Sequence, residues 1–74
     1  MKKSKYTEVL KFGDNVRKLR VKKGLTQEDL ADLTNLQAAY IGFVERGLRS
    51  PSVRTIAKLY KALGTVPNNL FKGV

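Results

Sequence analysis

The sequence contains no cysteine and no histidine. The absence of thiols excludes disulfides and thiolate metal sites, and the absence of imidazoles removes the usual ligand sets for zinc. Carboxylates alone could still hold a hard cation, but no group of Asp and Glu residues has the spacing of a calcium-binding loop. We therefore expect the protein to use no metal and no other cofactor.

Long apolar runs and glycine-rich phosphate loops are missing as well. Every apolar segment is far shorter than the roughly 18 residues that a membrane-spanning helix needs. Met1, Lys2 and Lys3 resemble the start of a signal peptide, but no hydrophobic region follows them. No nucleophile paired with a base can be assembled either. The sequence thus predicts a cytoplasmic protein that is not an enzyme, has no membrane association and takes no small-molecule ligand.

Positive charge is what the sequence has in excess, with 15 Lys and Arg against 6 Asp and Glu and a net charge of +9. Residues 1–23 carry nine basic and two acidic side chains, residues 24–45 carry four acidic and no basic ones, and residues 46–74 carry six basic and no acidic ones. This order indicates two basic contacts to a polyanion that flank a segment with another task. Basic charge also serves solubility, so the pattern alone does not establish binding.

Apolar periodicity and turn residues predict five short helices and no strand, which defines an all-α domain at residues 7–74 behind a basic arm at residues 1–6. Either Thr7 caps the first helix, or the helix begins later at Gly13 and Asp14. Gly24 then ends it. The stripe of this helix that is predicted to be buried consists of Val9, Phe12, Val16 and Leu19.

The second and third predicted helices are joined by a tight turn. Thr26 and Asp29 have the spacing of a capping box at the start of the second helix, which ends near Thr34. Asn35 suits the turn because asparagine tolerates a left-handed conformation, and the third helix then runs from about residue 37 to residue 45. The residues predicted to face the core are Leu30, Ala31 and Leu33 in the second helix and Tyr40, Ile41 and Val44 in the third.

The last two predicted helices follow a short loop. Ser52 is predicted to cap a fourth helix at about residues 53–63, which Gly64 ends. Pro67 suits the first position of a short final helix. The buried side of the fourth helix is predicted to consist of Val53, Ile56, Leu59, Tyr60 and Leu63.

Two short helices with a tight turn between them, at residues 24–46, have the geometry of a helix-turn-helix. The stretch from Phe12 to Phe71 resembles the lambda-repressor-like helix-turn-helix family, also called the Cro/C1 or XRE family. The matching runs are Val16-Arg17-Lys18-Leu19-Arg20, Lys23-Gly24-Leu25-Thr26-Gln27-Glu28-Asp29-Leu30-Ala31, Tyr40-Ile41-Gly42, Val44-Glu45-Arg46-Gly47, Pro51-Ser52-Val53 and Lys61-Ala62-Leu63-Gly64. Asn35-Leu36 and Tyr40-Ile41-Gly42 look like the restriction–modification controller branch. The resemblance implies a compact five-helix DNA-binding domain.

The resemblance also implies a set of DNA-contacting residues. The first turn of the third helix and one later position would meet base edges: Gln37, Ala38, Ala39, Tyr40 and Phe43. Phosphates would be contacted by residues at the start of the second helix, after the third helix and at the start of the fourth: Thr26, Gln27, Arg46, Arg49 and Ser52. Arg20 and Glu45 match an ion pair between the first and third helices. We interpret this pair as structural, because removing one partner strands a charge.

The predicted base-contacting residues depart from the family pattern, in which arginine, threonine, glutamine or asparagine often stand where this sequence has Ala38 and Ala39. Alanine cannot make the bidentate contact to guanine that arginine makes. We therefore expect phosphate contacts and DNA shape to contribute more than base contacts, and a preferred site rich in A·T pairs. Phe43 has three interpretations: contact with thymine methyls, contact with a partner protein, or cover for neighbouring side-chain stems.

The predicted function is a sequence-specific transcriptional regulator whose partner is double-stranded DNA. One recognition helix reads only about half a turn of DNA, so we expect a homodimer on a pseudo-palindromic operator. Lys2, Lys3 and Lys5 of the arm either reach into a groove or form a solvated tail. Family analogy and unplaced apolar side chains put the dimer interface at Tyr60, Val66, Leu70 and Phe71.

Two other classes of function stay open on the sequence alone. The first is a protein-interaction module, such as an antitoxin or a co-regulator, with only non-specific nucleic-acid binding. The second is association with RNA, because a charge of +9 attracts any polyanion. In a chain of this length we expect no separate sensor or effector domain, so regulation would act through concentration, cooperative binding or a partner protein.

Overall fold

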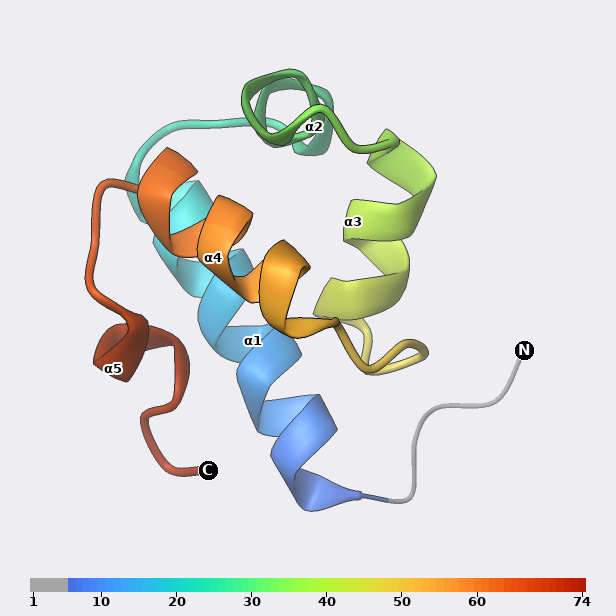
Figure 1. Cartoon of the computed structure of the whole chain (residues 1–74), viewed down its shortest axis with the longest axis vertical. Helices are drawn as coiled ribbons and strands as arrows, with labels where there is room; N and C mark the ends of the chain where they lie inside the picture. The colour runs from blue at the N-terminus through green and yellow to red at the C-terminus, as the bar shows by residue number, and fades with distance from the viewer. Residues whose placement is uncertain (1–5) are drawn as a thin grey trace.

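The computed structural model describes residues 6–74, and these form five α-helices without a strand (Figure 1). The helices are α1 (Thr7–Lys22), α2 (Gln27–Thr34), α3 (Ala38–Glu45), α4 (Val53–Ala62) and α5 (Pro67–Leu70). The prediction of an all-α, five-helix domain is therefore confirmed. The predicted arm falls almost entirely outside the described residues, so its boundary stays a prediction. None of the described helices is long and apolar enough to cross a bilayer.

The five helices contact one another in a closed ring. Along this ring α1 contacts α3, α3 contacts α2, α2 contacts α4, α4 contacts α5, and α5 returns to α1. Figure 1 shows α2 at the top of the view, α3 on the right and α5 on the left. The ring encloses an apolar core that consists of Phe12, Val16, Leu30, Ala31, Ile41, Val44, Leu59, Leu63 and Leu70.

Helix α1 is continuous, so the alternative start at Gly13 is wrong. The cap prediction for Thr7 is also wrong, because Tyr6 occupies the cap position and Thr7 is the first helical residue. Gly13 is buried, and a Cβ atom there would lie 2.1 Å from the backbone oxygen of Val44. The glycine is therefore needed because α1 and α3 approach closely at this point, and it does not mark the beginning of a helix.

The turn between α2 and α3 has the predicted chemistry. Thr26 Oγ1 accepts a hydrogen bond from the N–H of Asp29 at 3.0 Å, and Asp29 Oδ2 accepts one from the N–H of Thr26 at 2.9 Å. These reciprocal bonds form the capping box at the start of α2. Asn35 adopts the left-handed conformation with φ of 55°. Gln37 is then the N-cap residue of α3.

Two of the apolar residues predicted to be buried are exposed instead. Leu33 is 59% exposed and Val53 is 84% exposed, whereas Thr34 and Thr55 are buried. Thr34 Oγ1 donates to a carbonyl oxygen one turn earlier at 2.7 Å, and Thr55 Oγ1 accepts a hydrogen bond from Ser52 Oγ at 3.1 Å. A threonine with a local hydrogen bond can occupy the inner side of a short helix. The rotation of each helix about its axis therefore turns these two threonines toward the core and turns Leu33 and Val53 toward the surface.

The predicted starts of α4 and α5 are confirmed. Ser52 Oγ accepts a hydrogen bond from the first turn of α4 at 3.2 Å, and Pro67 is the first residue of α5. Asn15 of α1 then holds the C-terminal segment, because its Nδ2 donates to the carbonyl oxygens of Leu70 and Lys72, both at 2.9 Å. Leu70 has no exposed surface. Its predicted place in a dimer interface is therefore wrong, since the side chain fills the core of the monomer.

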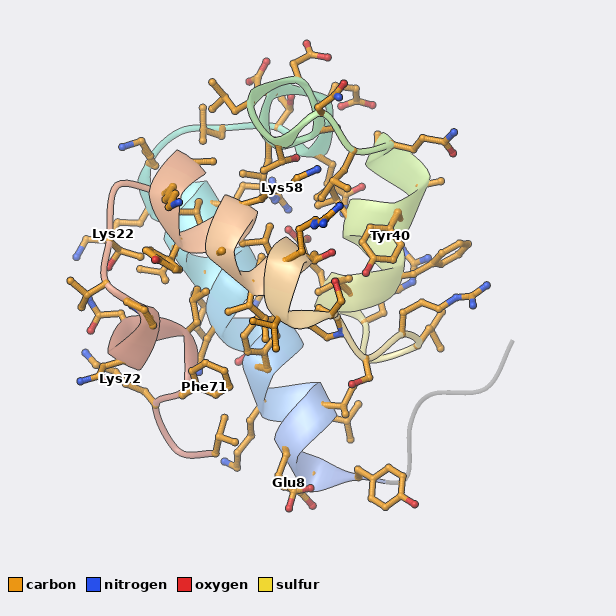
Figure 2. All side chains as sticks on the ribbon, viewed as in Figure 1. Glu8, Lys22, Tyr40, Lys58, Phe71 and Lys72 are labelled. Carbon is orange, nitrogen blue, oxygen red and sulfur yellow. The ribbon has the colours of Figure 1, made fainter. Side chains whose placement is uncertain are left out.

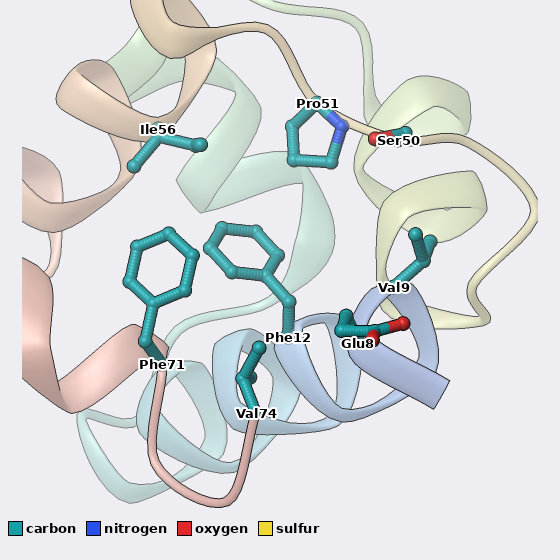
Figure 3. Close-up of a pocket in the computed structure, with 8 residues that line it drawn as sticks. All are labelled: Glu8, Val9, Phe12, Ser50, Pro51, Ile56, Phe71 and Val74. Carbon is teal, nitrogen blue, oxygen red and sulfur yellow. The ribbon is translucent and has the colours of Figure 1, made fainter. Parts of the chain in front are cut away.

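Phe71 packs against α1 and is also partly exposed. Its ring centroid lies 5.1 Å from that of Phe12, with the two rings tilted by 53°. A mostly apolar pocket of about 120 Å³ lies beside this pair, and Ile56 of α4 and Val74 also line it (Figure 3). Phe71 is 42% exposed. The C-terminal segment thus closes one side of the core and presents apolar side chains at the surface.

Candidate nucleic-acid interface

Three side chains from three helices form a hydrogen-bonded network behind the helix-turn-helix. Arg20 of α1 is paired with Glu45 of α3 through Nε and Oε2 at 2.6 Å and through Nη2 and Oε1 at 3.0 Å. Gln27 of α2 donates from Nε2 to the same Oε1 at 3.1 Å. The side chain of Glu45 is 2% exposed and that of Arg20 is 13% exposed. The predicted ion pair is therefore present, and it includes a third residue.

This network fixes the orientation of α1, α2 and α3. The hydrogen bond to Glu45 raises the pKa of Arg20, so the guanidinium is charged throughout the physiological range. Arg20 also donates from Nη1 to the carbonyl oxygen of Leu25 at 2.9 Å, in the connection before α2. Removing one member of a buried pair typically costs about 3–5 kcal/mol, because the remaining charge is left without a partner. The interpretation of the pair as structural agrees with this geometry.

Gly42, in the middle of α3, marks the point where two of the predicted phosphate-contacting side chains meet. A Cβ atom on Gly42 would lie 3.1 Å from Nη1 of Arg46 and 3.5 Å from Oε1 of Gln27. The end of α3 and the start of α2 therefore place these two side chains over the same glycine. Sequence reasoning missed Gly42 as a site residue. The available signal was a glycine inside a short helix, where it costs about 1 kcal/mol relative to alanine.

The predicted base-contacting residues in the first turn of α3 differ in exposure. Gln37 and Ala39 are exposed, whereas Ala38 and Tyr40 are half-buried and pack against the core. The side chain of Gln37 makes no capping hydrogen bond to α3, so its amide is not used by the helix that it precedes. Tyr40, which is labelled in Figure 2, lines an open hollow together with Thr55 of α4. Gln37 and Ala39 are therefore the outermost of the predicted reading residues.

Phe43 lies beside two arginines at the end of α3. The guanidinium carbon of Arg46 is 5.7 Å from the centroid of the ring, and that of Arg49 is 5.6 Å from it. Phe43 is half-buried and both arginines are exposed. Neither arginine forms an ion pair with a carboxylate within residues 6–74. Their charge is thus available to an external anion.

Thr26 and Ser52 hold the N-termini of α2 and α4. The hydroxyl oxygen of each accepts a backbone hydrogen bond from the first turn of its helix. The structure thus confirms their capping roles. The phosphate contacts of these two residues stay a prediction.

The acidic middle segment of the chain has two parts in the structure. Glu28, Asp29 and Asp32 are exposed on α2. Figure 2 shows oxygen-ended side chains gathered around this helix, at the top of the view. The fourth carboxylate, that of Glu45, is buried against Arg20. The negative charge at the surface of this segment therefore belongs to α2, while α3 has no exposed acidic residue.

These features define a helix-turn-helix DNA-binding domain. The short helices α2 and α3 are joined through a left-handed asparagine, an ion pair lies behind them, and side chains are exposed at the start of α3. The chain belongs to the helix-turn-helix family of the Cro/C1 type, because the sequence model of the Helix-turn-helix family matches residues 16–67. It is a DNA-binding transcriptional regulator of this family and not an enzyme.

Several similar proteins carry the description of control or controller proteins. The chain is 44% identical over 62 residues to control protein C.BamHI from Bacillus amyloliquefaciens, which covers 82% of this chain and 76% of that protein. It is 44% identical over 54 residues to control protein C.SmaI from Serratia marcescens, which covers 73% of this chain and 64% of that protein. The crystal structure of the restriction-modification controller protein C.AhdI from Aeromonas hydrophila has a TM-score of 0.86 and 48% identity, and the match covers 89% of this chain and 100% of that one. These likenesses confirm the predicted family and fold.

Proposed function

We propose that the protein binds a pseudo-palindromic DNA operator as a dimer, with α3 in the major groove. The observation that carries this proposal is the exposure of Gln37 and Ala39 at the start of a helix whose other end is held by the Arg20–Glu45 pair. A helix that is fixed from behind and exposed in front presents its side chains to base edges in one register.

Different residues of the proposed interface recognise the bases and contact the phosphates. Gln37 offers one amide and Ala39 one methyl group, which suit the edges of A·T pairs better than those of G·C pairs. Arg46, Arg49 and Gln27 hold the phosphates, together with Thr26 and Ser52 at two helix N-termini. Gln27 keeps a second amide hydrogen beside the one that it donates to Glu45, so it can reach a phosphate without leaving the network. Phosphate contacts therefore contribute more affinity than base contacts, and the preferred site is rich in A·T.

The dimer forms through apolar side chains of α4 and the C-terminal segment. Tyr60 is half-buried, while Val66 and Phe71 are exposed. These three residues are the members of the predicted interface that have surface to bury against a second copy. Two copies of α3 would then read two half-sites, which gives the specificity that a single short helix lacks.

The regulated genes are those of a restriction–modification system, and the protein acts in the cytoplasm. This part of the proposal is supported by the identity of 48% to a restriction-modification controller protein over its whole length. The likeness to two control proteins at 44% identity supports it as well. The operator is therefore expected upstream of the genes of such a system in the source genome.

Selection of bound sequences from random duplex DNA tests the proposal. The expected motif has two inverted, A·T-rich half-sites whose centres are about 10 base pairs apart. If no motif is recovered and the affinity depends on salt concentration but not on DNA sequence, a protein-interaction module would be favoured instead. Equal competition by RNA would favour an RNA partner. A motif rich in G·C would contradict only the assignment of Gln37 and Ala39 to A·T pairs.

A further inference from the structure

Phe43 has surroundings that its sequence-based interpretations do not include, because two guanidinium groups lie beside its ring. Its ring is half-buried at the end of α3, and two exposed guanidinium groups lie against it at 5.7 Å and 5.6 Å from the centroid. A ring in this position attracts cations through the negative charge on its faces. With two cations on the ring, the side chain presents guanidinium groups rather than an apolar face to a partner.

The backbone after α3 brings both arginines to this ring. Arg46 is one helical turn beyond Phe43 and is the C-cap residue of α3. Gly47 then adopts a positive φ of 73°, and the N–H of Leu48 donates to the carbonyl oxygen of Phe43 at 2.8 Å. This hydrogen bond closes a Schellman-type turn, which reverses the chain. Arg49, which follows this turn, therefore lies beside the ring of Phe43.

The ring lies against both guanidinium groups, whereas no carboxylate of the described residues forms an ion pair with either of them. The ion pairs found within residues 6–74 use Arg17, Lys18 and Arg20 and leave out Arg46 and Arg49. A carboxylate would neutralise a guanidinium that it held, whereas an aromatic ring holds the group and leaves its charge in place. Arginines held in this way are prearranged for an anion, and less side-chain freedom is lost when the anion binds.

We propose that Phe43 is a positioning residue that holds Arg46 and Arg49 as a pair of phosphate contacts, one at the end of α3 and one in the turn after it. The inference rests on the proposed DNA-binding function and reassigns Phe43 from base contact to phosphate positioning. Gly42 contributes to the same arrangement, because it leaves room for the guanidinium of Arg46 over α3.

Replacement of Phe43 by leucine removes the ring and keeps an apolar side chain, and replacement by tyrosine keeps the ring. Affinity is measured by fluorescence anisotropy over a range of salt, on the selected operator and on an unrelated duplex. Phe43→Leu is expected to weaken binding to both duplexes by about three- to tenfold, through the lost cation–π contacts. It is also expected to make the slope of log K against log salt shallower by about one. Phe43→Tyr is expected to bind like the wild type.

A double-mutant cycle keeps the test valid if Phe43→Leu also lowers stability. In a protein that carries Arg46→Gln and Arg49→Gln, the further change Phe43→Leu is expected to leave affinity unchanged, since no arginine remains to be positioned. An effect of Phe43→Leu that is equally large in both backgrounds would overturn the proposal. A loss confined to one base pair of the operator, with the salt slope unchanged, would also overturn it and assign Phe43 to base reading. Failure of the proposed function would be seen separately, as a wild-type protein that does not distinguish the two duplexes.

Discussion

Two glycines inside helices have opposite surroundings. A Cβ atom on Gly13 would meet backbone oxygens of α3, at 2.1 Å for Val44 and 2.9 Å for Glu45. A Cβ atom on Gly42 would meet the ends of two flexible side chains, those of Arg46 and Gln27. Backbone atoms inside a packed domain cannot move aside, whereas side-chain ends can. The same substitution is therefore expected to act on stability at one position and on binding at the other.

Gly13→Ala is expected to lower the free energy of unfolding by about 3 kcal/mol, the upper part of the usual range for overpacking, because the obstacle is backbone. Gly42→Ala is the matched control. It is expected to keep or raise stability, since alanine in a helix interior is better than glycine by about 1 kcal/mol, and to weaken DNA binding by displacing Arg46. Urea unfolding followed by circular dichroism measures the stability of both variants. A Gly13→Ala protein as stable as the wild type would contradict the close approach of α1 and α3.

Residue roles can be predicted from sequence where the chemistry is local. The capping box of Thr26 and Asp29 and the left-handed turn at Asn35 depend on neighbours within a few residues, and both are confirmed. Leu33 and Val53 are predicted wrongly because a helix of only 8 or 10 residues allows several rotations that fit the apolar pattern equally well. Gly13 is misread for another reason: a glycine that permits close packing and one that breaks a helix look the same in a single sequence.

Among the helices, α2 has an N-terminus whose stability depends on pH. Hydrogen bonds from the backbone N–H and the side chain of Thr26 hold the pKa of Asp29 below its ordinary value of 3.8. A lowered pKa means that the charged carboxylate stabilises the folded state. This stabilisation is present above the unfolded-state pKa and is lost as the pH falls through the lower folded-state value.

Asp29→Asn isolates this effect, because asparagine keeps the shape of the side chain and has no charge to lose. The difference in Tm between wild type and variant is expected to be largest at pH values well above the ordinary pKa of 3.8 and to shrink as the pH falls through the lowered pKa of Asp29, because the wild-type carboxylate then becomes protonated. Asp14, whose pKa is lowered by hydrogen bonds from Lys18 and Arg17, is present in both proteins and cancels in the comparison. Thermal unfolding at several pH values gives the result. A difference that stays constant down to the acid limit would show that the charge of Asp29 has no part in the cap.

The order and approximate bounds of the helices are predictable, because the residues that begin and end a helix act within a few positions of its ends. The partners of each helix are not predictable in the same way. That α1 packs on α3 and α5 is a property of the closed ring and involves residues far apart in the chain. For the same reason the sequence indicates Gln27 and Arg46 as separate phosphate contacts, whereas their meeting over Gly42 requires the packing of α2 on α3.

Over the whole molecule, some positively charged side chains lie close to α3 and others lie on the side of α5. Figure 2 shows Lys22 and Lys72 on the left of the view, on the side of α5, whereas α3 lies on the right. Arg46 and Arg49 follow α3 directly in the chain. Removing either pair lowers the net charge of +9 by two. The two double variants therefore compare contact with general attraction at equal net charge.

The variant with Arg46→Gln and Arg49→Gln is expected to bind all duplexes more weakly and to show a salt slope shallower by about two, because two phosphate contacts are lost. The variant with Lys22→Gln and Lys72→Gln is expected to keep a slope close to that of the wild type. Titrations of labelled duplex at several salt concentrations provide both slopes. Equal changes in the two variants would mean that bulk charge, and not contact by these arginines, determines the affinity.

The proposed dimer gives a prediction at the same scale. Val66 is 56% exposed beside α5, and Leu33 is 59% exposed on α2, so an aspartate at either position is tolerated by the fold. Val66→Asp is expected to shift the protein toward monomer, because a charge would have to be buried in the interface. Leu33→Asp is expected to leave the oligomeric state unchanged. Sedimentation velocity at several protein concentrations distinguishes these outcomes, and a dimer that withstands Val66→Asp would move the interface elsewhere.

The outward position of Gln37 and Ala39 has a consequence for how such regulators diverge. Both side chains lie outside the core, so under the proposed base-reading role new residues at these two positions are expected to change the preferred operator with little loss of stability. Ala38 and Tyr40 are bound to the core and allow less variation. Copies of one ancestral gene can therefore acquire separate operators through a few exposed substitutions. Two descendants could then work in the same cell without acting on each other's genes.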